Sequence, residues 1–82
     1  MWESHPNPVM FSYHTKQKLP RMEMYGKTNP LQNKLNNVDG VEECYTIRKY
    51  ELHVCVGKAF TNLSDLNRIK KEIERIINEF LN

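Results

Sequence analysis

Two cysteines and a histidine in the middle of the chain are the residues best suited to metal chemistry. Cys44, His53 and Cys55 offer two thiols and an imidazole, the ligand types that bind zinc and iron in proteins. In an antiparallel hairpin over residues 41–56, Cys44 is expected directly opposite His53, with Cys55 diagonal to Cys44. The pattern suggests a zinc or iron–sulfur site on one face of the hairpin, completed by His5 or a second subunit. The alternative is that both cysteines are small, half-buried residues, because their spacing is not that of a known zinc motif.

Catalytic arrangements are not indicated. Cys44 and His53 are the residue types of a nucleophile and its base, but no orienting carboxylate or oxyanion hole is evident in so short a chain. Glu42, Glu43 and Glu51 are interpreted as solvated carboxylates on strands. The three glycines stand singly, so the chain has no glycine-rich phosphate loop. We therefore expect a protein that is not an enzyme.

The hairpin that positions the cysteines is the clearest strand signal in the chain. Two alternating series run through VEECYTIRKYELHVCVG, namely Val41, Glu43, Tyr45 and Ile47, then Tyr50, Leu52, Val54 and Val56. If Arg48 and Lys49 form the turn, both series lie on a single apolar face of the hairpin. Tyr45 then faces Leu52. Arginine and lysine are not the residues that favour a two-residue turn, so a longer loop is the alternative.

Two more strands are expected near the N-terminus. The stretch VMFSYHT, residues 9–15, alternates in the way that is typical of a strand. The stretch RMEMY, residues 21–25, places Met22 and Met24 on one side and predicts a second strand paired with the first. Residues 1–7 are expected to form an extended or partly disordered lead-in.

Helix signals occur on both sides of the hairpin. A short helix is predicted from Pro30, with Thr28 or Asn29 as its N-cap and Gly40 supplying the positive φ that turns the chain afterwards. Its buried stripe is Leu31, Leu35 and Val38. A longer helix is predicted over residues 61–82. Its candidate caps are Thr61, Asn62 and Ser64, and its apolar stripe is Leu66, Ile69, Ile73, Ile76, Ile77 and Phe80.

These elements predict an α+β fold. The order is strand, strand, helix, strand, strand, helix (ββαββα), which indicates a two-layer sandwich of a mainly antiparallel four-stranded sheet with two helices packed on one face. A length of 82 residues makes a single domain over residues 1–82 with a small core.

Composition and charge narrow the classes of partner. The net charge of +2 comes from 12 basic and 10 acidic residues that are mixed along the chain, without the basic stripe that is typical of a nucleic-acid binder. The apolar runs are too short to span a bilayer, and the N-terminus does not resemble a signal peptide. Two cysteines are too few for a small disulfide scaffold. We expect a soluble protein of the reducing cytoplasm with a protein partner.

The N-terminal stretch ESHPNPVMFSY carries a more specific signal. It resembles the opening of the Nfu/NifU N-terminal domain, the accessory domain of iron–sulfur scaffold proteins, in which a Pro-Asn-Pro motif precedes a hydrophobic strand. Pro6, Asn7 and Pro8 stand at that motif, whereas His5 and Val9 depart from the residues usual in the family. Physically, the two prolines keep this segment extended as it enters the strand. A stiff lead-in that protects a sheet edge is the structural alternative to ligand contact.

A second stretch strengthens this resemblance. The segment NPLQNKLNNVDGVEECYTIRKYELHVCV is similar to the family's helix, acidic-Gly-Val turn and hairpin, with Asp39, Gly40 and Val41 at the turn. The other matching positions are Pro30, Leu31, Leu35, Val38, Leu52 and Val54. With the closing helix, the resemblance extends from about Glu3 to Phe80.

The resemblance implies a function in iron–sulfur cluster assembly. Scaffolds of this family hold the cluster with a C-x-x-C motif in a separate domain, and this chain has no such motif. It therefore resembles a free-standing accessory domain that binds a scaffold or target protein and carries no cofactor. Two alternatives stay open. One is a metal- or cluster-binding protein that uses Cys44, His53 and Cys55, and the other is a regulatory module that binds an unrelated protein through the open face of the sheet.

Overall fold

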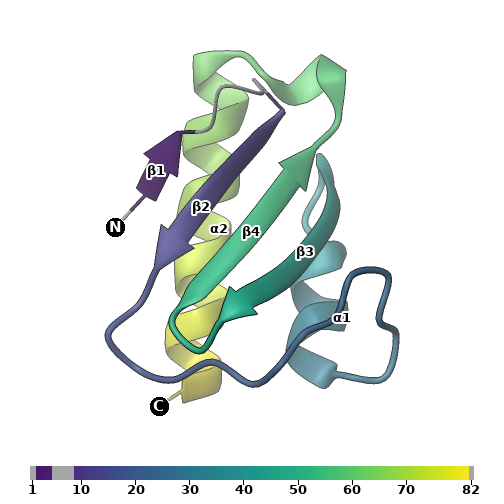
Figure 1. Ribbon diagram of the computed structural model, residues 1–82. Coiled ribbons are helices and arrows are strands. Elements are labelled where there is room, and N and C mark those ends of the chain that lie inside the picture. The colour runs from purple at the N-terminus through teal and green to yellow at the C-terminus, as the bar shows by residue number, and fades with distance from the viewer. Residues whose placement is uncertain (1, 5–8, 82) are drawn as a thin grey trace.

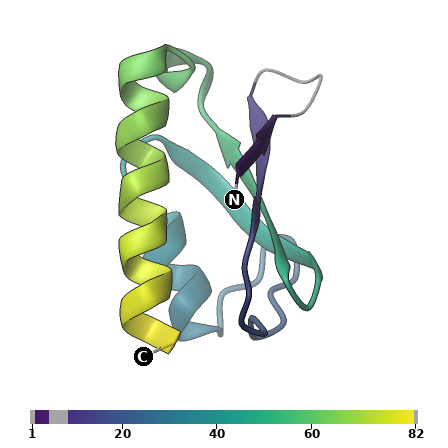
Figure 2. The ribbon, with the colours of Figure 1, turned by 90° about the vertical axis from the view of Figure 1, so that its left-hand side faces the viewer.

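Four antiparallel strands form one sheet, and both α-helices lie on the same side of it (Figures 1 and 2). The computed structural model describes residues 2–4 and 9–81. The elements are β1 (Trp2–Ser4), β2 (Met10–His14), α1 (Pro30–Asn36), β3 (Val41–Arg48), β4 (Glu51–Val56), the 3₁₀ turn η1 (Lys58–Phe60) and α2 (Leu63–Leu81). The strand order in the sheet is β1-β2-β4-β3. The predicted α+β fold and the order ββαββα are therefore confirmed.

The first two strands are not both the ones expected. Residues 2–4, assigned to the lead-in, form β1, which pairs with β2. The tryptophan holds this short strand in place: the Trp2 ring lies 5.0 Å from that of Phe11 and 4.6 Å from that of Tyr13. The indole Nε1 donates a hydrogen bond of 2.5 Å to Oε1 of Glu74 on α2. The motif Pro6-Asn7-Pro8 and its neighbour His5 lie outside the described residues.

The strand predicted over residues 21–25 is wrong. The segment has no strand pairing, although Met22 is buried and its carbonyl accepts a 2.9 Å hydrogen bond from the N–H of Thr46 at the edge of β3. The chain then turns at Tyr25, which has a φ of 61° in the left-handed region. The methionine side chain therefore reaches the core from an irregular loop, while Met24 stays 52% exposed.

Helix α1 begins through the predicted residues, and it ends at Asn36 with Asn37 as its C-cap. Oδ1 of Asn29 accepts the N–H groups of Leu31 at 2.9 Å and Gln32 at 3.2 Å, and Pro30 occupies the first turn. After the helix, Gly40 has a φ of 98°. A Cβ atom there would meet the Phe60 ring at 2.9 Å, so this position requires glycine on two counts.

Helix α2 is capped by Asn62. Its Oδ1 accepts the N–H of Asp65 at 2.9 Å, and its Nδ2 donates to the Asp65 carboxylate at 2.6 Å. In the described residues, no helix is long and apolar enough to cross a membrane.

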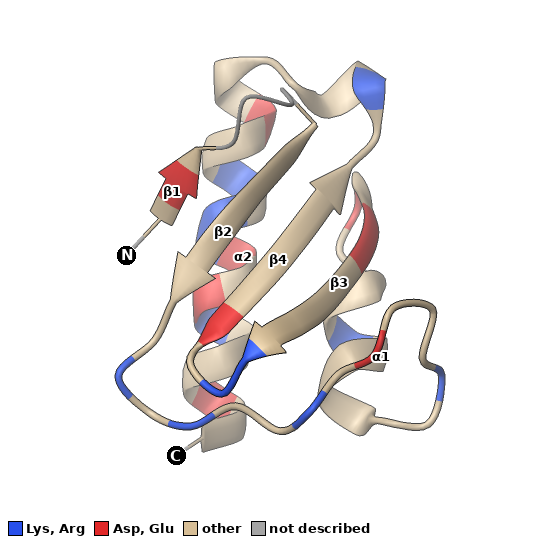
Figure 3. Cartoon of the chain, in the orientation of Figure 1, with Lys and Arg blue, Asp and Glu red and all other residues tan. Residues whose placement is uncertain are grey.

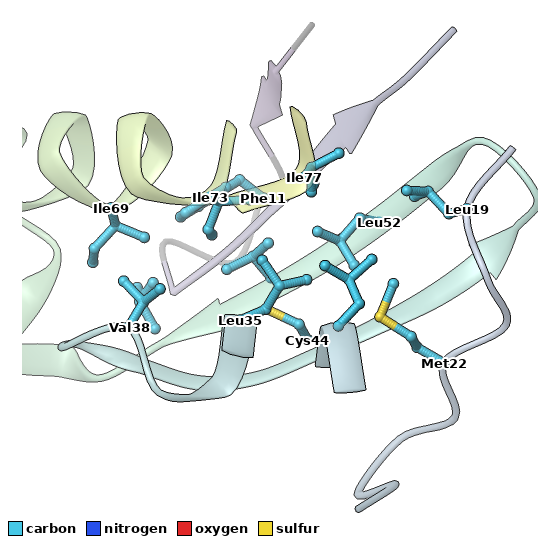
Figure 4. Packing of buried hydrophobic residues seen from close by; sticks show 13 residues of the cluster. Phe11, Leu19, Met22, Leu35, Val38, Cys44, Leu52, Ile69, Ile73 and Ile77 are labelled. Atoms are coloured by element: carbon cyan, nitrogen blue, oxygen red, sulfur yellow. The ribbon is translucent and has the colours of Figure 1, made fainter. Parts of the chain in front are cut away.

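The core lies between the helices and the sheet (Figure 4). Its buried residues are Phe11, Leu19, Met22, Leu31, Leu35, Val38, Cys44, Leu52, Val54, Val56, Ile69, Ile73 and Ile77. The predicted stripe of α1 is buried as expected, and Ile69, Ile73 and Ile77 form the buried stripe of α2. Phe80, expected in the same stripe, is 43% exposed because it lies near the end of the helix.

Candidate functional site

The register of the β3–β4 hairpin decides where its reactive side chains point. Cys44 pairs with Val54, and Tyr45 pairs with His53. The turn consists of Lys49 and Tyr50, one residue later than predicted. The predicted pairing of Cys44 with His53 is therefore wrong by one position.

Two irregularities in β3 account for this shift. The pairing skips one residue between Val41 and Glu43 and another between Thr46 and Arg48, so Glu42 and Ile47 are extra residues in bulges. Side chains of a strand alternate between faces, so a one-residue slip exchanges the faces of the segment between the bulges. Residues 43–46 of β3 therefore point to the faces of the sheet opposite to those predicted.

The slip separates the three predicted metal ligands. Cys44 faces the helices and is 0% exposed, whereas His53 and Cys55 lie on the opposite, outer face of the sheet. Burial and the nearby Glu43 carboxylate raise the pKa of the Cys44 thiol far above its usual range, so it stays protonated. The described residues contain no group of three or more His, Cys, Asp or Glu side chains that could hold a metal ion. The arrangement predicted for a metal site on one face is therefore wrong.

A carboxylate–imidazole pair lies on the outer face. Oε2 of Glu51 is 2.6 Å from Nε2 of His53, and this hydrogen bond is the main cause that lowers the pKa of the Glu51 carboxyl. Burial opposes that shift in the Glu51 pKa. The Tyr45 ring lies 5.5 Å from the imidazole. Cys55 is half-buried beside them, and burial followed by the Glu43 charge raises the pKa of its thiol. This thiol is thus a weak nucleophile at neutral pH.

The outer face also brings together the residue types of a hydrolase triad. Ser12 pairs with His53 across β2 and β4, and His53 contacts Glu51. The sequence gives no local signal for this set, because the serine is about 40 residues away from the other two. However, Ser12 is 0% exposed, so its hydroxyl cannot be reached by a substrate. The geometry gives these residues a structural role.

A groove at the turn end of the hairpin combines charged and apolar side chains. Its volume is about 660 Å³. The basic residues that line it are Lys18, Arg21, Arg48 and Lys49. The apolar ones are Leu19, Met22, Met24 and Ile47. Figure 3 shows that basic positions gather along the connection after β2 and at the β3–β4 turn.

Backbone hydrogen bonds bring the two halves of this groove together. The N–H of Thr15 donates to the Tyr50 carbonyl at 2.9 Å, and the N–H of Leu19 donates to the Lys49 carbonyl at 2.7 Å. The connection after β2 is thereby fixed against the hairpin turn. This cluster has no local signal in the sequence, because its two parts lie about 30 residues apart in the chain.

The turn residues of the family resemblance lie at the other end of β3. Asp39 is exposed, Gly40 makes the turn, and Val41 packs against the core. The Gly40 carbonyl accepts the N–H of Gly57 at 2.9 Å, which ties the start of β3 to the end of β4. These residues therefore have a structural role in the turn between α1 and β3.

Comparison with known proteins finds no matching family model, no similar curated protein and no similar solved structure.

Proposed function

We propose that this chain is a non-enzymatic accessory domain that binds a protein partner in iron–sulfur cluster assembly. The resemblance of its motifs to the Nfu/NifU N-terminal domain supports the link to cluster assembly, and the partner would be an iron–sulfur scaffold or a target protein. The role requires no cofactor in this domain. We propose that it acts in the cytoplasm, where its two free cysteines remain reduced.

The observation that carries the binding role is the exposure of large apolar side chains at the turn end of the hairpin. Met24 is 52% exposed, Ile47 is 52% exposed and Tyr50 is 50% exposed. Ile47 is the extra residue of a bulge, and bulges often re-aim a side chain away from the regular faces of a sheet. Clustered apolar exposure with a polar rim is typical of surfaces that bind other proteins.

The test is a titration of the isotopically labelled chain with a purified C-x-x-C scaffold domain, in its apo and cluster-loaded forms, followed by NMR. We expect shifts concentrated around Ile47 and at least tenfold weaker binding for Ile47→Asp. Leu63→Asp is the matched control. Leu63 is the first residue of α2, is 75% exposed, and lies far from the hairpin turn (Figure 1). An absence of shifts, or equal losses in both variants, would contradict the proposal.

The same titration separates the alternatives. Shifts confined to Tyr45 and His53 would indicate a regulatory module that binds through the outer face of the sheet. Binding of zinc or a cluster by Cys44, His53 and Cys55 is not favoured, because the core position of Cys44 would have to be given up.

A further inference from the structure

The groove at the hairpin turn carries an excess of positive charge, because four basic residues and one acidic residue line it. Among its basic residues and the adjacent Lys16, only Arg21 forms an ion pair in the described part of the chain, with Glu23 at 3.1 Å. Lys18, Arg48 and Lys49 are exposed. Clustered cations of this kind raise the local concentration of acidic partners and steer their approach.

The base of the groove is apolar. Leu19 and Met22 are 2% and 1% exposed and form part of the core, while Met24 and Ile47 remain open to solvent beside them. A volume of about 660 Å³ accommodates several side chains of a ligand rather than a single one. The surface thus combines an apolar contact area with a cationic rim.

Strand addition is not the mode of recognition that this surface allows. The edge of β3 is already occupied, because Gln32 Nε2 donates to the Cys44 carbonyl at 2.8 Å and Asn36 Oδ1 accepts the Cys44 N–H at 2.9 Å. The N–H of Thr46 is bonded to the Met22 carbonyl. A ligand must therefore be recognised by side chains and not by backbone pairing.

We propose that this groove binds an acidic segment of the partner protein, with an apolar side chain of the segment against Met24 and Ile47 and its carboxylates paired with the basic rim. This inference rests on the proposed function and names the chemistry of the partner. The acidic Glu23 in the rim disfavours a continuous phosphate backbone, and aromatic platforms for stacked bases do not line the groove. A protein segment therefore fits better than a nucleic acid.

Fluorescence anisotropy with labelled peptides tests the proposal. The probes are a 12-residue peptide of Asp and Glu around a central Leu-Phe pair, the same peptide with Ser-Ser at the centre, and a single-stranded 12-nucleotide DNA. We expect the acidic–apolar peptide to bind the tightest, with at least tenfold loss for the Ser-Ser peptide. The affinity of the acidic–apolar peptide should fall at least fivefold between 50 and 500 mM NaCl, because exposed ion pairs are screened by salt.

Paired charge reversals locate the site. Lys18→Glu with Lys49→Glu should weaken peptide binding at least tenfold, since both residues are exposed and neither forms an ion pair in the described part of the chain. Lys58→Glu with Lys71→Glu changes the net charge equally at exposed positions away from the groove and should leave affinity within twofold. Thermal unfolding of both double variants verifies that the fold is retained.

Three outcomes would overturn the inference: equal losses in the two double variants, tighter binding of the DNA, or no dependence on the central Leu-Phe pair. A scaffold domain that binds at Ile47 while no acidic peptide binds would refute the acidic chemistry and leave the proposed function standing. Peptide binding at the groove without binding of any scaffold domain would refute the link to cluster assembly and support the acidic chemistry.

Discussion

Replacing Gln32 by leucine should destabilise the protein more than the same change at its exposed neighbour Asn33. The side chain is 1% exposed, and its Nε2 donates to two carbonyls, Glu23 at 2.7 Å and Cys44 at 2.8 Å. One amide group therefore joins helix α1, the loop that carries the groove, and the edge strand β3. Leucine keeps most of the volume and removes both donors.

Loss of the Gln32 donor has a different free-energy cost at each of the two carbonyl groups. The Glu23 carbonyl still accepts the N–H of Gly26 at 2.9 Å, so its loss is that of one ordinary hydrogen bond, about 0.5–1.5 kcal/mol. The Cys44 carbonyl belongs to a fully buried residue, and leaving such an acceptor without its donor costs about 1–3 kcal/mol. The sum predicts that Gln32→Leu lowers the free energy of unfolding by about 1.5–4.5 kcal/mol.

Urea unfolding followed by the fluorescence of the single tryptophan measures this change. Asn33→Leu is the matched control, because Asn33 is the next residue of α1, is exposed, and its side-chain amide donates a single hydrogen bond in the described part of the chain, to the Lys27 carbonyl at 3.0 Å. We expect the control to change stability by less than about 0.5–1 kcal/mol. If Gln32→Leu costs no more than Asn33→Leu, the amide does not hold the loop to β3 and the reasoning fails.

Three further changes test other parts of the structure. Gly40→Ala should lower the free energy of unfolding by about 1–3 kcal/mol in urea titrations, because alanine pays for the positive φ and meets an aromatic ring, and an unchanged midpoint would contradict this. Glu51→Gln should destabilise the protein at pH 7 and do so less at pH 3. The hydrogen bond from His53 lowers the folded-state pKa of Glu51, so its stabilisation is present above the ordinary value of 4.5 and disappears as the pH falls through the lower folded value. The prediction fails if the variant is equally destabilised at both pH values. Iodoacetamide and mass spectrometry should show slow modification of Cys55 that speeds up with pH, and modification of Cys44 only after unfolding, because burial raises the pKa of both thiols but only Cys44 is sealed in the core. Rapid labelling of native Cys44 would refute its assigned position.

The helices could be predicted from the sequence because their signals are local. The cap at Asn29, the proline that follows it and the glycine at position 40 act on neighbouring backbone groups, and all three have the predicted roles. The periodic stripes of α1 and α2 point to the core by helix geometry alone, so burial of Leu35 and Ile73 follows from spacing. The α+β class follows from the order of these elements.

The strands near the N-terminus are harder to predict from the sequence, because tertiary contacts determine the structure of short segments. Residues 21–25 alternate like a strand, but only the Met22 side chain and one carbonyl are needed at the sheet edge, and the backbone turns at Tyr25. Residues 2–4 show little periodicity, and β1 forms because Trp2 contacts Phe11 and reaches Glu74 on α2. A contact between positions 2 and 74 has no local signature in the sequence.

The register of the hairpin determines which side chains share a face in the candidate site, and the alternation of residues in the sequence does not determine that register. Extra residues at Glu42 and Ile47 leave the strands recognisable while exchanging the faces between them. That exchange buries the Cys44 thiol, which removes the predicted metal site, and it leaves Ile47 exposed beside Met24. The same local irregularity therefore argues against ligation by the cysteines and in favour of a binding surface at the turn. The basic residues of that surface reinforce this reading, since the N–H of Leu19 fixes Lys18 and its neighbours against the turn by a backbone bond that no charge pattern in the sequence reveals.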